Sequence, residues 1–212
     1  MAVSDGALRE GLLYDLLGRI QHEDIRTRSV ADLARRYHAD AVQARLVAET
    51  SLHALDQAAA GWGLDQEETG RWLNWAAQLH EIGLDIAHSR HQHHAAYIIE
   101  HCDLAGFSVQ EQLFLAALVR SHRRKLPLKL YKDLPKWIGK LVPKLSVLLR
   151  LGVILNRNRG TNAVCDFDLQ VQEKRVKLKF PPGWLKQQPL TRADLEIEAE
   201  YLYAAGFVLE VA

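Results

Sequence analysis

The sequence predicts a mainly α-helical protein, with a helical bundle over residues 21–157 and a small α+β unit of order β-β-α-β over residues 158–212. Helix-start signals and broad apolar faces recur up to about residue 157. Beyond that point the pattern changes to strict alternation of apolar and polar residues, which is typical of a half-buried hairpin. A chain of 212 residues is long enough to bury a sizeable core.

Polar residues that can cap free backbone N–H groups mark the helix starts. Four pairs have this spacing: Asp65 with Glu68, Ser108 with Glu111 and, more loosely, Asp40 with Gln43 and Ser29 with Asp32. The helix from Asp65 is expected to end at Gly83, because glycine adopts the left-handed conformation that closes helices. Pro143 suits the first turn of a last helix, whose apolar run Leu145 to Leu155 predicts full burial.

The alternation after residue 160 predicts two paired strands. Their apolar positions are Cys165, Phe167, Leu169 and Val171, then Val176, Leu178 and Phe180. Pro181-Pro182-Gly183 ends the hairpin, a helix runs from near Thr191 to Gly206, and residues 207–211 predict a third strand.

Composition excludes several classes of protein. The chain has 27 lysines and arginines against 26 acidic residues, so any anion binding must come from local clustering. No apolar run approaches the roughly 20 residues that span a bilayer, and the N-terminus has no signal-peptide pattern. Two cysteines, Cys102 and Cys165, are too few for a disulfide framework, which predicts a reducing, cytoplasmic location.

One segment concentrates positive charge. Nine lysines and arginines lie between Arg120 and Lys144, opposed only by Asp133. Arginine pairs with phosphate oxygens through two N–H groups and lysine acts as a mobile point charge, so the run predicts a groove for a long polyanion. The alternative is a solvated basic face. The residues predicted to bind such a polyanion are Arg120, His122, Arg123, Arg124, Lys125, Lys129, Lys132 and His94.

Histidines gather in the middle of the chain, at positions 80, 88, 91, 93, 94 and 122. Together with Glu81 they could form a metal site, because imidazole and carboxylate are common ligands. The alternative is a set of polar residues on the surface and between helices. Trp72 and Trp75 lie on one apolar helix face, which favours a core role over base stacking, whereas Trp137 lies among lysines.

Residues 76–83, Ala-Ala-Gln-Leu-His-Glu-Ile-Gly, resemble the His-Asp core of the HD phosphohydrolase superfamily, whose members bind divalent metals inside a helical bundle. Carried over residue by residue, the first histidine of that pattern falls near Gln43, its aspartate is Glu81, and its last metal-binding aspartate is Val153. The resemblance therefore implies an HD-like fold that has lost its metal, with a degenerate site around His80 and Glu81. It also places His94 near the mouth of that site, where it either touches substrate or caps a helix.

Residues 3–14, with the string Ala-Leu-Arg-Glu-Gly, resemble the end of the actin-like catalytic half of the Ppx/GppA phosphatases. Residues 22–26, 43–45, 118–123 and 149–156 resemble their helical C-terminal half. The resemblance implies that residues 1–20 are the tail of a catalytic half that supplies Mg²⁺-dependent hydrolysis, and no catalytic residue is expected in this chain.

The resemblance implies the C-terminal region of an exopolyphosphatase that binds inorganic polyphosphate, contacts its own actin-like domain, forms a homodimer and supports processivity. Three alternatives remain open. They are the C-terminal half of guanosine pentaphosphate phosphatase, an active metal-dependent HD phosphohydrolase, and a nucleic-acid-binding module.

Overall fold

The computed structural model describes residues 25–159 and 166–212, so the predictions for residues 1–20 and for Cys165 lie outside the described residues. Residues 25–36 are helical. The elements that follow are α2 (Ala41–Trp62), α3 (Gln66–Leu79), the 3-10 helix η1 (Ile82–Asp85), α4 (His91–His101), α5 (Val109–Arg120), α6 (Leu128–Asp133), α7 (Lys136–Leu155), β1 (Asp168–Gln172), β2 (Arg175–Lys179), α8 (Trp184–Gln187), α9 (Pro189–Tyr203) and β3 (Val208–Val211). The predicted fold class, mainly helical with a small C-terminal sheet, is confirmed. The predicted domain boundary near residue 158 stays a prediction.

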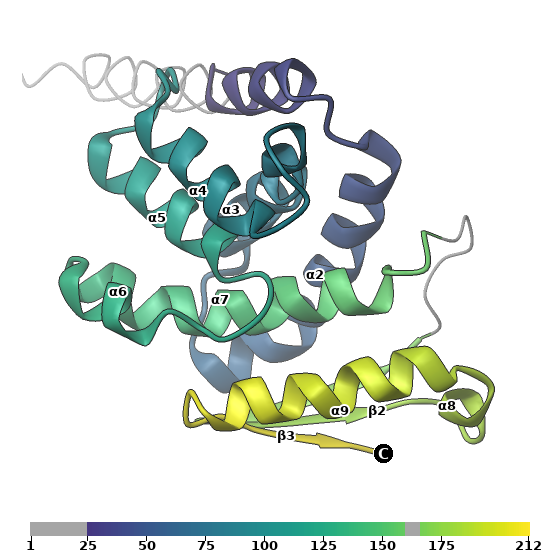
Figure 1. Ribbon diagram of the computed structural model, residues 1–212. Helices are drawn as coiled ribbons and strands as arrows, with labels where there is room; N and C mark the ends of the chain where they lie inside the picture. Colours follow the sequence, from purple (N-terminus) through teal and green to yellow (C-terminus); the bar gives the residue numbers. More distant parts are fainter. Residues whose placement is uncertain (1–24, 160–165) are drawn as a thin grey trace, which may run out of the picture.

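The helical part packs around α7, which runs beneath α3, α4 and α5 in Figure 1 and contacts α2, α3 and α5. The rings of Trp72 and Trp75 meet edge to face, 5.1 Å apart, and both side chains are buried. Their predicted place in the core is confirmed. Such aromatic pairs add stability beyond the area they bury.

Within the described residues, no helix is long and apolar enough to cross a bilayer.

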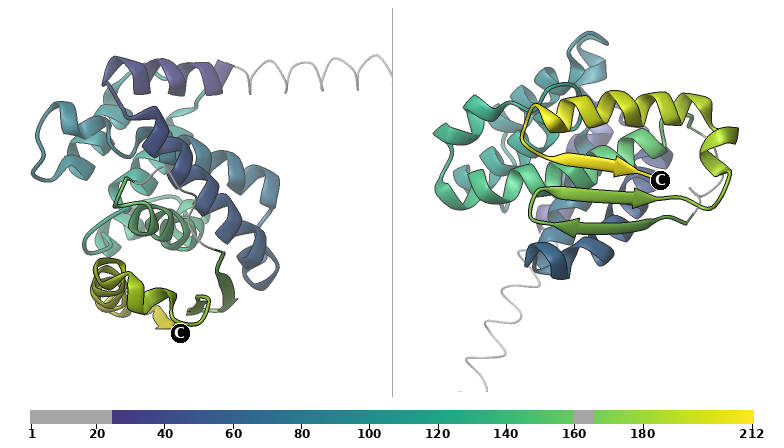
Figure 2. Two further views of the ribbon diagram at one scale, coloured as in Figure 1. Left: turned by 90° about the vertical axis from the view of Figure 1, so that its right-hand side faces the viewer. Right: turned by 90° about the horizontal axis from the view of Figure 1, so that it is seen from below.

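The sheet has the order β1-β2-β3 and lies with α9 beneath the helical part (Figure 2). β1 pairs antiparallel with β2, with Leu169 opposite Leu178, and β2 pairs parallel with β3. The alternating apolar side chains Leu169, Val176 and Leu178 are buried, which confirms the predicted hairpin and third strand. The indole of Trp62 on α2 donates to the carbonyl of Glu173 at 2.8 Å and so fixes the hairpin turn to the bundle.

Capping predictions are confirmed at three helices. Ser108 and Glu111 form a complete capping box, Asp65 accepts from the N–H of Glu68, and Asp40 accepts from the N–H groups of α2's first turn. The fourth pair is wrong. Ser29 lies inside the helix over residues 25–36, where its hydroxyl donates to backbone carbonyls.

Two predicted helix boundaries are also wrong. α3 ends at Leu79, and Gly83 lies in η1 without a positive φ. A Cβ on Gly83 would lie 2.0 Å from the carbonyl oxygen of His91, so glycine is required there by the close approach of α4. Pro143 lies inside α7, which begins at Lys136. The apolar stripe of α7 continues upstream of Pro143, and its packing outweighs the hydrogen bond that proline cannot make.

A buried ion pair joins the helical part to the small unit. Arg150 on α7 is 1% exposed and donates through two nitrogens to the carboxylate of Glu198 on α9, one of these bonds being 2.6 Å long. Its remaining guanidinium nitrogen donates to the carbonyl of Ser121 at 2.7 Å. Bidentate geometry with a third acceptor is the arrangement that offsets the desolvation of a buried pair.

Candidate anion-binding site

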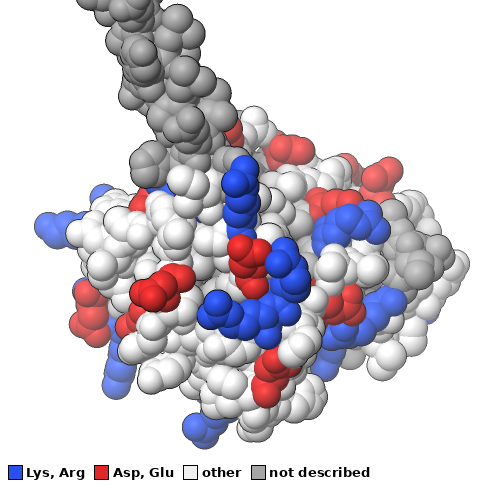
Figure 3. Space-filling model, turned by 90° about the horizontal axis from the view of Figure 1, so that it is seen from above, with Lys and Arg blue, Asp and Glu red and all other residues white. Residues whose placement is uncertain are grey.

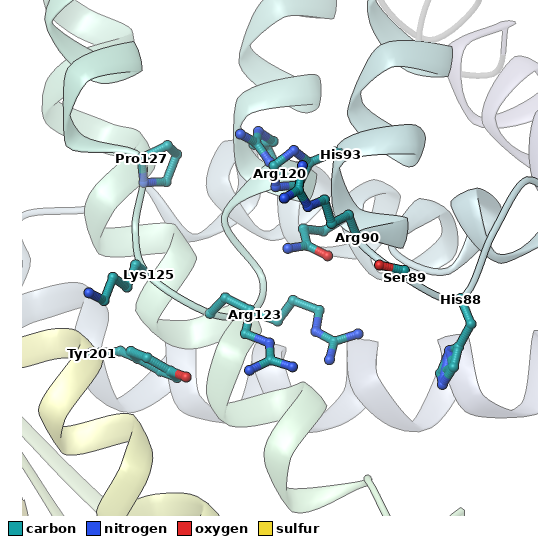
Figure 4. A pocket seen from close by; sticks show the side chains of 11 residues that line it. His88, Ser89, Arg90, His93, Arg120, Arg123, Lys125, Pro127 and Tyr201 are labelled. Carbon is teal, nitrogen blue, oxygen red and sulfur yellow. The ribbon is translucent and has the colours of Figure 1, made fainter.

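A cleft of about 910 Å³ opens between the start of α4, the loop after α5, and α9. Five of the residues that line it are cationic: Arg90, Arg120, Arg123, Arg124 and Lys125. The other lining residues are His88, Ser89, Gln92, His93, Pro127 and Tyr201. Figure 4 shows side chains from these separate segments converging on one space. We call this cleft the basic pocket.

Most of the cations in the basic pocket have no counter-ion. Among the residues that the structure describes, the side chains of Arg90, Arg120, Arg124 and Lys125 make no ion pair or hydrogen bond. Burial, followed by the nearby charge of Arg90, lowers the pKa of Arg120, which means that these groups repel one another. An anion with several charges would relieve this repulsion.

Two of these arginines hold an unusual backbone conformation. Arg90 has φ 56° and Arg124 has φ 61°, the left-handed region that residues other than glycine, asparagine and aspartate rarely adopt. Such strain is retained where the surrounding structure over-determines it, and it often accompanies a functional site. Both residues lie in short turns that lead into or out of the helices bordering the basic pocket.

A second cavity, of about 430 Å³, adjoins the basic pocket and shares His88, Arg123, Arg124 and Tyr201 with it. It is lined by Gln43, His80, Glu81 and Val153, which are the residues that correspond to the HD pattern. The fold thus brings together four positions from α2, the end of α3 and α7 that are far apart in the sequence. We call this cavity the inner pocket.

Three buried histidines line the inner pocket in neutral form. The Nδ1 atom of His80 donates to the carbonyl of Ala77 at 2.7 Å, and that of His122 donates to the carbonyl of Val119 at 2.6 Å. Burial lowers the pKa of His80 and holds the pKa of His122 well below its ordinary value. Burial and the positive charge of Arg123 lower the pKa of His91 to about 4, and Arg123 donates to the Nε2 atom of His91.

The inner pocket does not fit a divalent metal. Over residues 25–159 and 166–212, no three His, Cys, Asp or Glu side chains are arranged to hold an ion. Glu81 instead accepts from Arg159 at 2.7 Å, and Arg159 also pairs with Asp40 at 2.9 Å. A guanidinium therefore neutralises the carboxylate that stands where the HD pattern has its aspartate.

Comparison with known proteins shows the family of this chain. The profile of "Ppx/GppA phosphatase, domain III" matches residues 25–199. The chain belongs to the Ppx/GppA phosphatase family. The chain is 34% identical over 207 residues to the guanosine-5'-triphosphate,3'-diphosphate pyrophosphatase of Aeromonas salmonicida, and 34% identical over 212 residues to that of Vibrio cholerae. These matches cover 98% and 100% of this chain but 42% of each relative.

In this Ppx/GppA domain, the predicted binding residues divide into two groups. Arg120, Arg123, Arg124 and Lys125 line the basic pocket together. Lys129 and Lys132 are exposed on α6 and border neither pocket. His122 is 2% exposed and lines the inner pocket. His94 is half-buried in the first turn of α4 and lines neither pocket, and Arg90, not His94, is the residue that precedes this helix. The polyphosphate-binding roles of all these residues stay predictions.

Sequence reasoning missed Arg90, Arg157, Arg159 and Tyr201. Arg90 has a weak local signal, since it lies in a short polar turn beside the histidine-rich stretch. Tyr201 has none, because α9 reaches the pocket only through the packing of α9 on α7. Elsewhere on the domain, basic and acidic side chains are interspersed on the face shown in Figure 3. Lys144, part of the predicted basic run, donates to the carbonyl of Trp62 at 2.9 Å and so links α7 to the end of α2.

Proposed function

We propose that this chain is the C-terminal part of an enzyme that hydrolyses guanosine 5'-triphosphate 3'-diphosphate, and that the basic pocket binds the phosphates of this substrate. The observation that carries the proposal is the set of cations without counter-ions in one cleft. Two relatives that match nearly the whole chain carry the name of that pyrophosphatase, which supports this substrate. The proposal assigns binding and orientation to this chain.

The physical basis is the match between a polyphosphate anion and the pocket. Guanidinium groups bind phosphate oxygens through two parallel N–H bonds, and Lys125 adds a movable positive charge. Each phosphate that is bound releases counter-ions, so the affinity depends steeply on salt concentration. Hydrolysis with Mg²⁺, contact with a preceding actin-like domain, and assembly into a homodimer remain parts of the proposal.

A second candidate substrate is inorganic polyphosphate, which would make the complete protein an exopolyphosphatase. The observation that favours it is the exposed lysines at positions 129, 132, 136 and 140, which extend the positive charge beyond the basic pocket along α6 and α7. A polyanion longer than a nucleotide could contact them. The two candidates differ in whether binding and turnover improve with the length of the phosphate chain.

Replacing Arg123, Arg124 and Lys125 together by alanine in the complete protein is expected to lower kcat/KM for guanosine 5'-triphosphate 3'-diphosphate by about 100-fold, because charge-assisted contacts to phosphate are lost. Phosphate release measures the effect. The matched control is Arg45→Ala, which removes an exposed arginine paired with Glu49, far along the chain from the pocket.

Phosphate release from short and long polyphosphate separates the two candidates. A loss confined to long polyphosphate would favour the exopolyphosphatase. An unchanged kcat/KM on every substrate would contradict a phosphate-binding role of the basic pocket.

A further inference from the structure

The inner pocket holds two buried hydrogen-bond acceptors that have no partner among the described residues. They are the Oε1 atom of Gln43 and the Nε2 atom of His80. Gln43 is 5% exposed and His80 is 2% exposed. Both residues line the inner pocket. An unsatisfied buried polar atom costs about 1–3 kcal/mol, so a molecule that supplies donors here would bind favourably.

The surrounding contacts fix both atoms as acceptors. The amide nitrogen of Gln43 donates to the carbonyl of Asn156 at 3.0 Å, which leaves its oxygen free. The Nδ1 atom of His80 donates to the carbonyl of Ala77, and burial keeps the ring neutral by lowering its pKa, so Nε2 carries a lone pair. The Oε1 atom of Glu81 lies 3.9 Å from Nε2, which is too far for a hydrogen bond.

The charges of the inner pocket disfavour a cation as the missing donor. Arg123, Arg124, Arg157 and Arg159 line it. Its acidic side chains are already paired: Glu81 with Arg159, Asp194 with Arg157, and Glu198 with Arg150. The molecule that satisfies the two acceptors therefore brings N–H or O–H donors and is neutral or joined to an anion.

We propose that the inner pocket binds the guanine base of a guanosine polyphosphate whose phosphates lie in the basic pocket. Guanine has two adjacent donors, N1–H and the N2 amino group, and the inner pocket offers two unpaired acceptors, on Gln43 and His80. Adenine offers one amino group on that edge, next to a nitrogen that accepts, and so leaves an acceptor unpaired. A site built to hydrogen-bond a donor edge rejects a ligand that lacks it.

The inner pocket and the basic pocket share lining residues, so a single nucleotide could occupy both. Arg123, Arg124 and Tyr201 line both, so a base on one side of them and phosphates on the other would belong to a single ligand. A volume of about 430 Å³ is within the range of ligand pockets. This inference rests on the proposed function, because it assigns the base of the same substrate whose phosphates the basic pocket binds.

The test is calorimetric titration of this chain with GTP, ATP and inorganic tripolyphosphate, which all carry three phosphates. GTP is expected to bind at least about tenfold more tightly than the other two. Gln43→Leu and, separately, His80→Phe are expected to remove this preference and to leave the affinity for tripolyphosphate unchanged, which also shows that each variant is folded. The matched control is Gln112→Leu, whose amide donates to the carbonyls of Ile99 and Cys102, away from both pockets.

The outcomes separate the inference from the proposed function. If all three ligands bind equally and Gln43→Leu changes nothing, water satisfies the two acceptors and the guanine site is overturned, whereas the phosphate site stands. If tripolyphosphate and GTP both fail to bind the wild-type chain, the phosphate-binding role and the inference that rests on it are both overturned.

Discussion

Arg150→Met is expected to lower the free energy of unfolding by about 3–5 kcal/mol, because it leaves the carboxylate of Glu198 buried without its partner. It also removes the donor to the carbonyl of Ser121 in the turn that follows α5. The variant is therefore expected to weaken both the contact between α7 and α9 and the turn at the edge of the basic pocket. Chemical denaturation monitored by circular dichroism measures it.

Two further variants separate this prediction from a general effect of mutation. The double variant Arg150→Met/Glu198→Leu is expected to recover most of the loss, since apolar side chains replace both charges. Glu196→Ala breaks the exposed pair with Arg192 on the same helix and is expected to cost less than about 1 kcal/mol. If Arg150→Met and Glu196→Ala destabilise the protein equally, the buried pair is not what joins the two parts.

The free energy of unfolding is expected to fall as the pH is lowered from about 7 to about 5. The pKa values of His80, His91 and His122 are lowered in the folded state, so the unfolded chain binds more protons across this window. Stability then rises with pH and is lost as the pH falls through the ordinary histidine pKa. Each buried histidine that stays neutral at pH 5 is expected to lower the free energy of unfolding by about 2 kcal/mol between pH 7 and pH 5.

His122→Phe provides the control for the pH dependence, because the variant has one titrating group fewer at the centre of the cluster, where the rings of His80 and His91 each lie 5.3 Å from that of His122. Denaturation curves of both proteins at the two pH values are compared. A smaller drop in the free energy of unfolding of the variant would support the assignment of the pH dependence to the buried histidines. Equal stability of the wild-type protein at both pH values would show that the histidines accept protons without cost in the folded state.

Local patterns predicted the fold class well. Caps such as that of Ser108 depend on a few neighbouring residues. The alternation of apolar and polar residues along 168–179 predicts which side of the hairpin is buried. The two wrong boundaries have a common cause in tertiary packing. Gly83 is set by the approach of α4, and Pro143 is held inside α7 by the core against which that helix packs.

The basic pocket was half predictable for the same reason. Arg120, Arg123, Arg124 and Lys125 are neighbours in the sequence, so their clustering is visible without a structure. Arg90 and Tyr201 join them only because α4 and α9 pack where they do. The HD resemblance named Gln43, His80 and Val153 as one site, but no pattern could show that two of its polar atoms lack partners.

The measurement that tests the central claim most directly is titration of this chain with guanosine 5'-triphosphate 3'-diphosphate at two salt concentrations, for the wild type and for Arg124→Asn. Asparagine tolerates the left-handed backbone of residue 124, so the variant loses the charge and keeps the turn. Long polyphosphate, short polyphosphate and single-stranded DNA are the competitors. Binding is expected to weaken with salt, to fall about tenfold or more in affinity in the variant, and to resist competition by DNA. Absence of binding, or binding that neither salt nor Arg124→Asn alters, would contradict a phosphate-binding role of the basic pocket.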